Sequence, residues 1–166
     1  MHFLPEKLDE YIVSHSETEP KLLQQLTRET YQKILQPIML SSPYQGRVLS
    51  MISKLKSPEN IIELGTFTGY STLCLAEGLA KEGTIHTIDI NEELEDFQRK
   101  YFDKSSYSEQ IIQHVGNALE IIPKILFDTI TGNLFLFSLK NFSAASKIVS
   151  FGEIESTFSV MYFETV

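Results

Sequence analysis

The chain has 166 residues, which suits one domain with a sizeable buried core. Its 42% of hydrophobic residues excludes a disordered chain, and its formal net charge of −8 disfavours a broad surface for nucleic acid or anionic membranes. The single cysteine, Cys74, excludes an internal disulfide and a Cys-x-x-Cys zinc site. No signal pattern and no apolar run of membrane-spanning length is present, so we expect a cytoplasmic protein without nucleic acid or membrane partners.

The first 57 residues are predicted to be helical and to precede the sheet. Residues 4–15 have an amphipathic pattern. A second helix is expected to start at Thr18-Glu19-Pro20, with the Thr18 hydroxyl as its cap, and to end near Pro37. The Pro, Ser and Gly content of residues 37–46 indicates a loop. A third helix is expected after it, with the apolar residues Val48, Leu49, Met51, Ile52 and Leu55.

The stretch Glu63 to Ser71 reads Glu-Leu-Gly-Thr-Phe-Thr-Gly-Tyr-Ser and separates a short β-branched strand from a helical pattern over residues 70–80. Gly65 and Gly69 permit a tight turn and a close approach by a ligand. The following helix directs its first backbone N–H groups at that ligand. Glu63 would repel a pyrophosphate, and the glycine spacing differs from Gly-x-Gly-x-x-Gly, so a nicotinamide dinucleotide is the weaker interpretation.

Two further predicted strands end in polar turns. The strand at residues 83–89 ends with Asp89, twenty positions after Gly69, which favours binding of the two ribose hydroxyls over a helix-capping role. Residues 92–104 are predicted to form a helix after this strand. The strand at residues 110–115 ends in Gly116-Asn117-Ala118, and a helix is predicted to follow. We interpret His86 and His114, which lie within these strands, as structural residues.

These motifs resemble the S-adenosylmethionine (SAM) site of the small metal-dependent O-methyltransferases, the family of catechol and caffeoyl-CoA O-methyltransferases. The resemblance covers about residues 17–126. It implies that Glu63 faces the amino-acid or sulfonium side of SAM, Ser71 its carboxylate, Asp89 the ribose and Ala118 the adenine. The implied cofactor contacts are Met39, Ser41, Glu63, Gly65, Phe67, Tyr70, Ser71, Asp89, Gly116, Asn117 and Ala118. It also implies a small-molecule acceptor, and N-terminal helices that take part in homodimer contacts and in covering the substrate. Plain packing is the alternative role of these helices and is favoured for most of their residues.

The resemblance ends after about residue 126. The family places magnesium-binding carboxylates on and after the next strand, yet no acidic residue occurs between Asp128 and Glu153, and only Asn133 offers an oxygen at the expected place. We therefore predict no metal ligands in this chain, identify no catalytic residue, and treat Lys140 as a surface lysine. A shifted reading frame or early stop, and a genuinely diverged tail, both remain open as explanations. Strands are predicted at 133–139 and 157–163.

The sequence thus predicts one α/β domain with a Rossmann-like SAM-methyltransferase sheet and early strand order 3-2-1-4. Its parts are N-terminal helices (1–57), a cofactor-binding core (58–126) and a divergent tail (127–166) that leaves the C-terminal part incomplete or atypical. The function expected from the resemblance is SAM-dependent O-methylation of a small hydroxylated, catechol-like acceptor. The alternatives are a catalytically impaired SAM-binding or protein-interaction remnant and, less favoured by Glu63, a nucleotide-sugar or dinucleotide enzyme.

Overall fold

A computed structural model of the chain describes residues 5–128, 134–138 and 159–162. The helices are α1 (Glu6–His15), α2 (Lys21–Lys33), α3 (Pro43–Lys56), α4 (Tyr70–Ala76), α5 (Glu95–Phe102) and α6 (Ala118–Asp128). The 3-10 helices are η1 (Pro37–Met39), η2 (Glu92–Leu94) and η3 (Ser108–Gln110). The strands are β1 (Asn60–Leu64), β2 (Thr84–Asp89), β3 (Ile111–Val115), β4 (Leu134–Ser138) and β5 (Ser159–Tyr162). Lys140 and the rest of the tail lie outside these residues.

The five strands form one parallel sheet in the order β3-β2-β1-β4-β5. The first four strands therefore have the predicted order 3-2-1-4, and β4 and β5 fall within the two predicted tail strands. Strand β1 is buried along its whole length, as its central position and its β-branched pair Ile61-Ile62 predict. Because all strands are parallel, the carboxyl ends of β1, β2 and β3 meet at one edge of the sheet.

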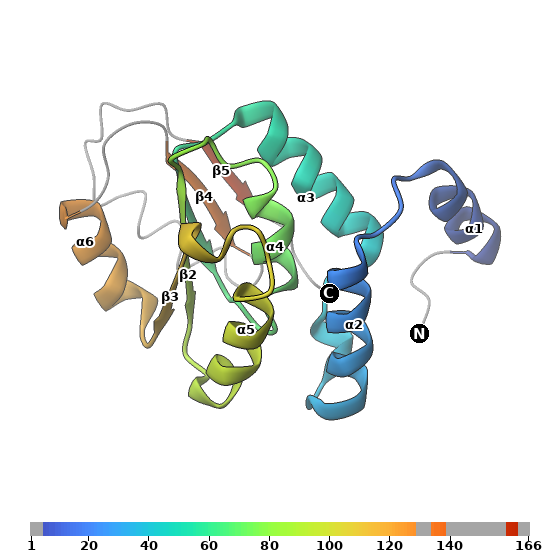
Figure 1. The fold of residues 1–166 in the computed structure, drawn as a ribbon, viewed down its shortest axis with the longest axis horizontal. Coiled ribbons are helices and arrows are strands. Elements are labelled where there is room, and N and C mark those ends of the chain that lie inside the picture. Colours follow the sequence, from blue (N-terminus) through green and yellow to red (C-terminus); the bar gives the residue numbers. More distant parts are fainter. Residues whose placement is uncertain (1–4, 129–133, 139–158, 163–166) are drawn as a thin grey trace.

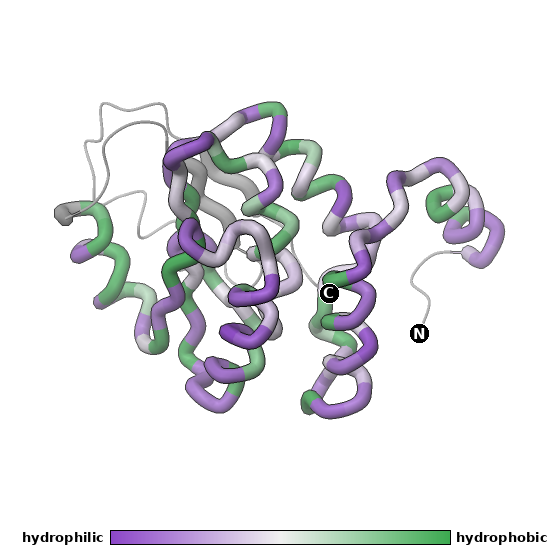
Figure 2. Tube along the Cα trace, viewed as in Figure 1, coloured by the Kyte–Doolittle hydropathy of each residue, from purple (hydrophilic) through white to green (hydrophobic). Residues whose placement is uncertain are grey.

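Helices cover both faces of the sheet, with α6 on one side and α2, α3, α4 and α5 on the other (Figure 1). The larger hydrophobic cluster joins Leu26 of α2, Leu49 of α3 and Phe102 of α5 to the side chains of α4 and the sheet. The smaller cluster packs Ile122 and Ile125 of α6 on the opposite face. Figure 2 shows α6 as a largely hydrophobic segment, which suits a helix that packs on a sheet.

The helix boundaries correct four sequence predictions. Helix α2 begins after Pro20 with no side-chain cap, so the predicted Thr18 cap is wrong. Helix α3 begins at Pro43, because Ser42 and Gln45 form a capping box, and Gly46 therefore lies inside this helix and not in the predicted loop. Helix α4 ends at Ala76 instead of residue 80. The segment predicted as one helix from residue 92 consists of η2 followed by α5.

The predicted apolar faces of α1 and α3 are only partly buried. No residue of α1 is buried, and this helix stands apart from the sheet (Figure 1). On α3, Leu49 is buried, whereas Val48, Met51 and Leu55 are exposed. The buried side of α3 instead carries small residues, such as Ser53, whose hydroxyl donates a hydrogen bond of 2.6 Å to the Leu75 carbonyl of α4. Small side chains let α3 and α4 pack closely.

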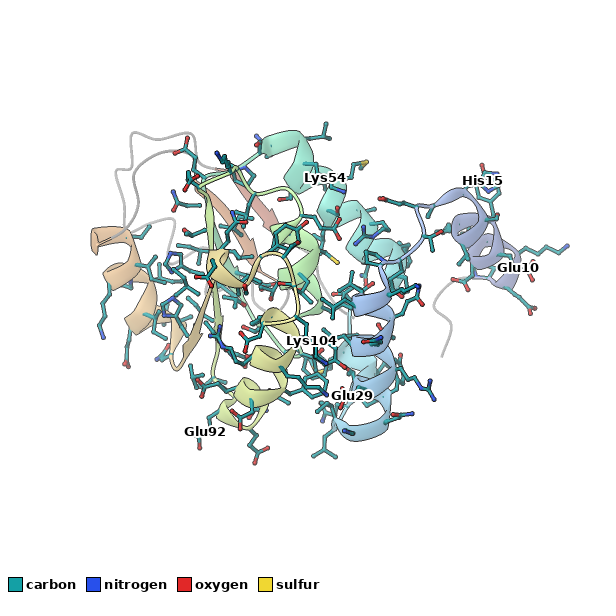
Figure 3. All side chains as sticks on the ribbon, viewed as in Figure 1. Glu10, His15, Glu29, Lys54, Glu92 and Lys104 are labelled. Carbon is teal, nitrogen blue, oxygen red and sulfur yellow. The ribbon has the colours of Figure 1, made fainter. Side chains whose placement is uncertain are left out.

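Two tyrosine–glutamate hydrogen bonds fasten α2 to the core. The Tyr70 hydroxyl donates to Glu19, just before α2, and the Tyr101 hydroxyl of α5 donates to Glu29 within α2. Lys100 forms an ion pair with Glu29 at 2.5 Å. Figure 3 labels Glu29 where α2 meets α5. Because these contacts lie at both ends of α2, they fix the helix across the α4–α5 side of the sheet.

Candidate cofactor site

The turn between β1 and α4 has an unusual backbone. Gly65 and Gly69 have φ angles of 91° and 85°, and Phe67 between them has a φ of 49°. A Cβ at Gly69 would lie 2.5 Å from the Phe102 ring, so only glycine fits there. Phe67 has a side chain in a left-handed conformation that L residues adopt at a cost. Such strain is typical of turns that hold a ligand.

Asp89, at the carboxyl end of β2, forms hydrogen bonds with both the glycine turn after β1 and the turn after β3. One of its carboxylate oxygens accepts a hydrogen bond of 2.7 Å from the Phe67 N–H, and the other accepts one of 3.1 Å from the Asn91 N–H. Its backbone carbonyl accepts a 2.8 Å bond from the Gly116 N–H. The glycine turn, Asp89 and the turn after β3 therefore meet at one place, as predicted. The capping role weighed for Asp89 belongs to Asn91, whose side chain caps η2.

Glu63 lies beneath this turn and is fully buried. Ser71 donates a hydrogen bond of 2.5 Å to one carboxylate oxygen, and Thr72 and Thr87 donate bonds of 2.5 and 2.7 Å to the other. Burial raises the pKa of Glu63 from 4.5 to about 7, and the three hydroxyl donors limit that rise. The carboxylate and the Ser71 hydroxyl are thus bound to each other, and contact of either with a ligand stays a prediction.

Tyr70 begins α4 and is buried. Its ring packs over Gly46 of α3, where a Cβ would lie 2.7 Å from a ring carbon. Burial raises the pKa of the Tyr70 hydroxyl, and Glu19, which accepts its hydrogen bond, raises it further. This side chain is therefore part of the packing between α2, α3 and α4, and its predicted contact with a cofactor stays a prediction.

The turn after β3 has the geometry of a helix cap. Gly116 has a φ of 142°, a conformation that favours glycine. The Asn117 side chain accepts a 3.0 Å hydrogen bond from the Leu119 N–H, and this contact caps α6. Ala118 opens α6 and packs against the smaller hydrophobic cluster. A small residue here leaves room beside the sheet edge, and its contact with an adenine stays a prediction.

Met39 ends η1 and Ser41 follows it, and both side chains are half-buried. Leu40 between them packs against the larger hydrophobic cluster, which fixes this segment on the α3 side of the molecule. Their proximity to a methyl donor stays a prediction.

The sequence interpretation missed two residues near Asp89. Gln98 of α5 is buried, and its side-chain amide donates a 2.6 Å hydrogen bond to the Phe67 carbonyl. Its spacing of four from Leu94 placed it on the inward face of the helix, a signal that could have found it. Ile90, next to Asp89, is a large apolar residue that is 78% exposed.

On the neighbouring strands β2 and β3, His86 and His114 form a hydrogen-bonded pair, with 3.0 Å between the His86 Nδ1 and the His114 Nε2. The rings are nearly parallel, and their centroids are 5.3 Å apart. Burial lowers the pKa of His86 from 6.5 to about 4, and His114 lowers it further. The predicted structural role agrees with this pairing. Cys74 is also buried as predicted, and burial raises the pKa of its thiol to about 12.

The described part of the chain does not by itself supply the metal site that the resemblance implies. These residues hold no group of three or more His, Cys, Asp or Glu side chains that could bind a metal ion. Asn133 lies outside them, and β4 contains no acidic residue. A magnesium ion needs several oxygen ligands, so the described residues alone do not hold one, and the absence of metal ligands from the chain stays a prediction. Within the same residues, no helix is long and apolar enough to span a membrane.

Comparison with curated proteins and solved structures identifies related chains. A catechol O-methyltransferase from Niastella koreensis is 32% identical over 90 residues, which are 54% of this chain and 41% of that protein. Caffeoyl-CoA O-methyltransferase 2 of Petunia hybrida is 34% identical over 110 residues, which are 66% of this chain and 45% of that protein. The chain thus spans less than half the length of either relative.

Solved structures share the fold. TomG, an O-methyltransferase from Streptomyces achromogenes in complex with SAM, matches with a TM-score of 0.77 and 24% identity, over 87% of this chain and 64% of that chain. An O-methyltransferase from Bacillus cereus in complex with SAH matches with a TM-score of 0.72 and 26% identity, over 80% and 60% of the two chains. The family described as O-methyltransferase matches residues 13–143. Because this match spans most of the chain, the chain belongs to the O-methyltransferase family.

Proposed function

We propose that this chain binds SAM at the carboxyl ends of β1, β2 and β3. The observation that carries the proposal is the convergence on Asp89, whose two carboxylate oxygens are oriented by the Phe67 and Asn91 amides. A carboxylate held in this way keeps free lone pairs on both oxygens and suits the two hydroxyls of a ribose. The complexes of TomG with SAM and of the Bacillus cereus enzyme with SAH support this choice of cofactor.

The remaining parts of SAM are assigned from the elements around Asp89. The adenine is placed against the Gly116–Ala118 turn, with the exposed Ile90 side chain as its apolar cover. The methionine part is placed over the glycine turn at Gly65 and Gly69, where backbone can approach closely. Glu63 lies below this turn, and its ionised form would favour the positive sulfonium or ammonium group above it.

The proposed reaction is O-methylation of a small hydroxylated, catechol-like acceptor, because related proteins are named catechol and caffeoyl-CoA O-methyltransferases. The acceptor oxygen attacks the methyl carbon, the sulfur–carbon bond breaks with its electrons going to the sulfur of the departing SAH, and the acceptor hydroxyl gives up its proton to water. The protein's contribution is proximity and alignment of the two reactants. In the family a magnesium ion would orient a diol and lower the pKa of its hydroxyl. No step is assigned to such an ion here.

Titration calorimetry with S-adenosylhomocysteine (SAH), the demethylated product, tests cofactor binding. The wild-type chain is expected to bind, and Asp89→Ala to bind about tenfold to a hundredfold more weakly, because a pair of charge-assisted hydrogen bonds is lost, worth about 1.5–3 kcal/mol. Glu59→Gln, which removes an exposed charge at the opposite end of β1, is the control. Normal binding by Asp89→Ala would show that the ribose contact is misassigned.

A methyl-transfer assay with catechol-type acceptors, with magnesium and with a chelator, tests the reaction. Metal-dependent turnover is expected to be weak, because residues 129–152 supply no carboxylate. Robust turnover that the chelator abolishes would contradict this expectation. A chain that binds SAH but methylates nothing would instead fit the second candidate function, that of a SAM-binding remnant.

The homodimer implied by the resemblance is supported by apolar side chains of α1. Leu8, Tyr11 and Val13 are 44%, 59% and 69% exposed, and none of them is covered by the described part of the chain. Sedimentation equilibrium of the wild-type chain and of a Leu8→Ser, Tyr11→Ser variant tests this proposal. A monomeric wild-type chain would refute it.

A further inference from the structure

Gln98 is the buried polar side chain of α5 nearest the cofactor turn, with 1% of its surface exposed. Its amide Nε2 donates a hydrogen bond of 2.6 Å to the Phe67 carbonyl. The amide of Gln113, on β3, donates to the Gln98 Oε1 and also lies 3.2 Å from the Glu95 carbonyl. Because Gln113 supplies the donor at Oε1, the NH₂ group of Gln98 is directed at Phe67.

Phe67 is held from both sides in its left-handed conformation. Its φ of 49° is one that an L side chain adopts only when neighbouring contacts enforce it. The N–H of Phe67 donates to Asp89, and its carbonyl accepts from Gln98. Without Gln98, the carbonyl would lose this hydrogen bond in a half-buried turn, and the φ and ψ angles of Phe67 would be less constrained. A change of these angles would reorient the preceding peptide group, which carries the Phe67 N–H, and would weaken its hydrogen bond to Asp89.

We propose that Gln98 is a positioning residue of the cofactor site: it holds Phe67 left-handed, so that the Phe67 N–H orients the Asp89 carboxylate for the ribose. This inference rests on the proposed binding of SAM. Gln98 touches no part of the proposed ligand and acts through two intermediates, the Phe67 peptide and the Asp89 carboxylate. Its effect on SAM affinity should therefore depend on the presence of Asp89.

A double-mutant cycle on SAH binding separates this role from general stabilisation. Gln98→Met keeps the length of the side chain but removes its donor, and is expected to weaken SAH binding about fivefold to tenfold, the equivalent of one net hydrogen bond. In the Asp89→Ala background the same substitution is expected to change affinity less than about twofold. Equal losses in both backgrounds would mean that Gln98 is merely structural, and an unchanged affinity would also overturn the proposal.

Gln110 provides a matched control. Its side-chain amide also donates to backbone carbonyls, at 2.8 Å from Gly83 and 3.2 Å from Ala80, but Gln110 ends η3 just before β3, at the opposite end of the sheet. Gln110→Met should lower the thermal midpoint as Gln98→Met does, while leaving SAH affinity unchanged. If Gln98→Met does not fold, Gln113→Met tests the same chain of hydrogen bonds, because it removes the donor that orients the Gln98 side chain. An SAH affinity about twofold to fivefold weaker is then expected, and an unchanged one overturns the proposal.

Hydrogen exchange of the Phe67 amide in the ligand-free chain tests the same claim without a cofactor. Gln98→Met is expected to speed exchange at Phe67 by about tenfold, and Gln110→Met to leave it unchanged. Unchanged exchange in Gln98→Met would overturn the proposal. Absence of SAH binding by the wild-type chain, together with faster exchange in Gln98→Met, would refute the proposed function and leave the Gln98–Phe67–Asp89 linkage standing.

Discussion

Glu63 makes the stability of the chain fall as the pH rises. Burial raises its pKa from 4.5 to about 7, so the folded chain binds a proton between these values that the unfolded chain has released. At about 1.4 kcal/mol per pKa unit, the shift corresponds to about 3 kcal/mol of unfolding free energy. This stability is fully present below pH 4.5 and is lost as the pH rises through 7.

His86 has the opposite effect over nearly the same range. Its pKa is lowered from 6.5 to about 4, so the unfolded chain binds the extra proton between these values. The corresponding stability, also about 3 kcal/mol, is fully present above pH 6.5 and is lost as the pH falls toward 4. Between pH 4.5 and 6.5 the two contributions offset each other. Together they change the unfolding free energy of the wild-type chain little over this pH range.

Single substitutions are therefore expected to reveal each contribution. With Glu63→Gln, the unfolding free energy should rise by about 2 kcal/mol from pH 4.5 to 6.5 relative to wild type. With His86→Asn, it should fall by about the same amount relative to wild type, because the contribution of His86 no longer offsets that of Glu63; His114, whose pKa burial also lowers, is present in both chains. Urea unfolding at several pH values and constant ionic strength measures both, and Glu59→Gln controls for removal of a charge from the surface. If the unfolding free energies of wild type and Glu63→Gln change equally with pH, the proposed contribution of Glu63 to stability is refuted.

Two packing predictions concern the same half of the chain. Gly69→Ala should lower the unfolding free energy by about 3 kcal/mol, because the φ of 85° at this position is unfavourable for alanine and the new Cβ would lie 2.5 Å from the Phe102 ring. A loss below about 1 kcal/mol in urea unfolding would contradict this expectation. Arg47→Met should cost about 2 kcal/mol, because it leaves the Glu77 carboxylate without its two-point partner at 2.7 and 3.0 Å, while Lys54 remains at 3.1 Å. An additional Lys54→Met should then cost more than it does alone.

The sheet could be predicted from the sequence because its signals are local. Ile61-Ile62 and the alternating residues of β2 are β-branched and lie between turn residues, so their strands follow from period and propensity. The order of the strands and the meeting of Gly65, Asp89 and Gly116 at one edge follow from parallel connections. The approximate position of the candidate site was thus accessible from the sequence.

The hydrogen bonds within the site were not accessible from the sequence, because side-chain pairing depends on the folded geometry. The hydrogen bond from the Ser71 hydroxyl to Glu63 was not foreseen, and the predicted contact of Ser71 with a ligand stays a prediction. Gln98 lies thirty-one residues from its partner Phe67, and nothing local specifies that pairing. Helical spacing located α3 but could not tell which of its apolar residues are buried, because the buried side of this helix carries small residues while Val48, Met51 and Leu55 are exposed.

The proposed cofactor site can be tested with a crystal structure of the chain grown in the presence of SAH. We expect SAH at the carboxyl ends of β1, β2 and β3, with its ribose hydroxyls within hydrogen-bond distance of Asp89 and its adenine against Gly116–Ala118. Asp89 should keep the 2.7 Å hydrogen bond from the Phe67 N–H in that complex. SAH bound elsewhere, or bound here with its ribose turned away from Asp89, would contradict the proposed site.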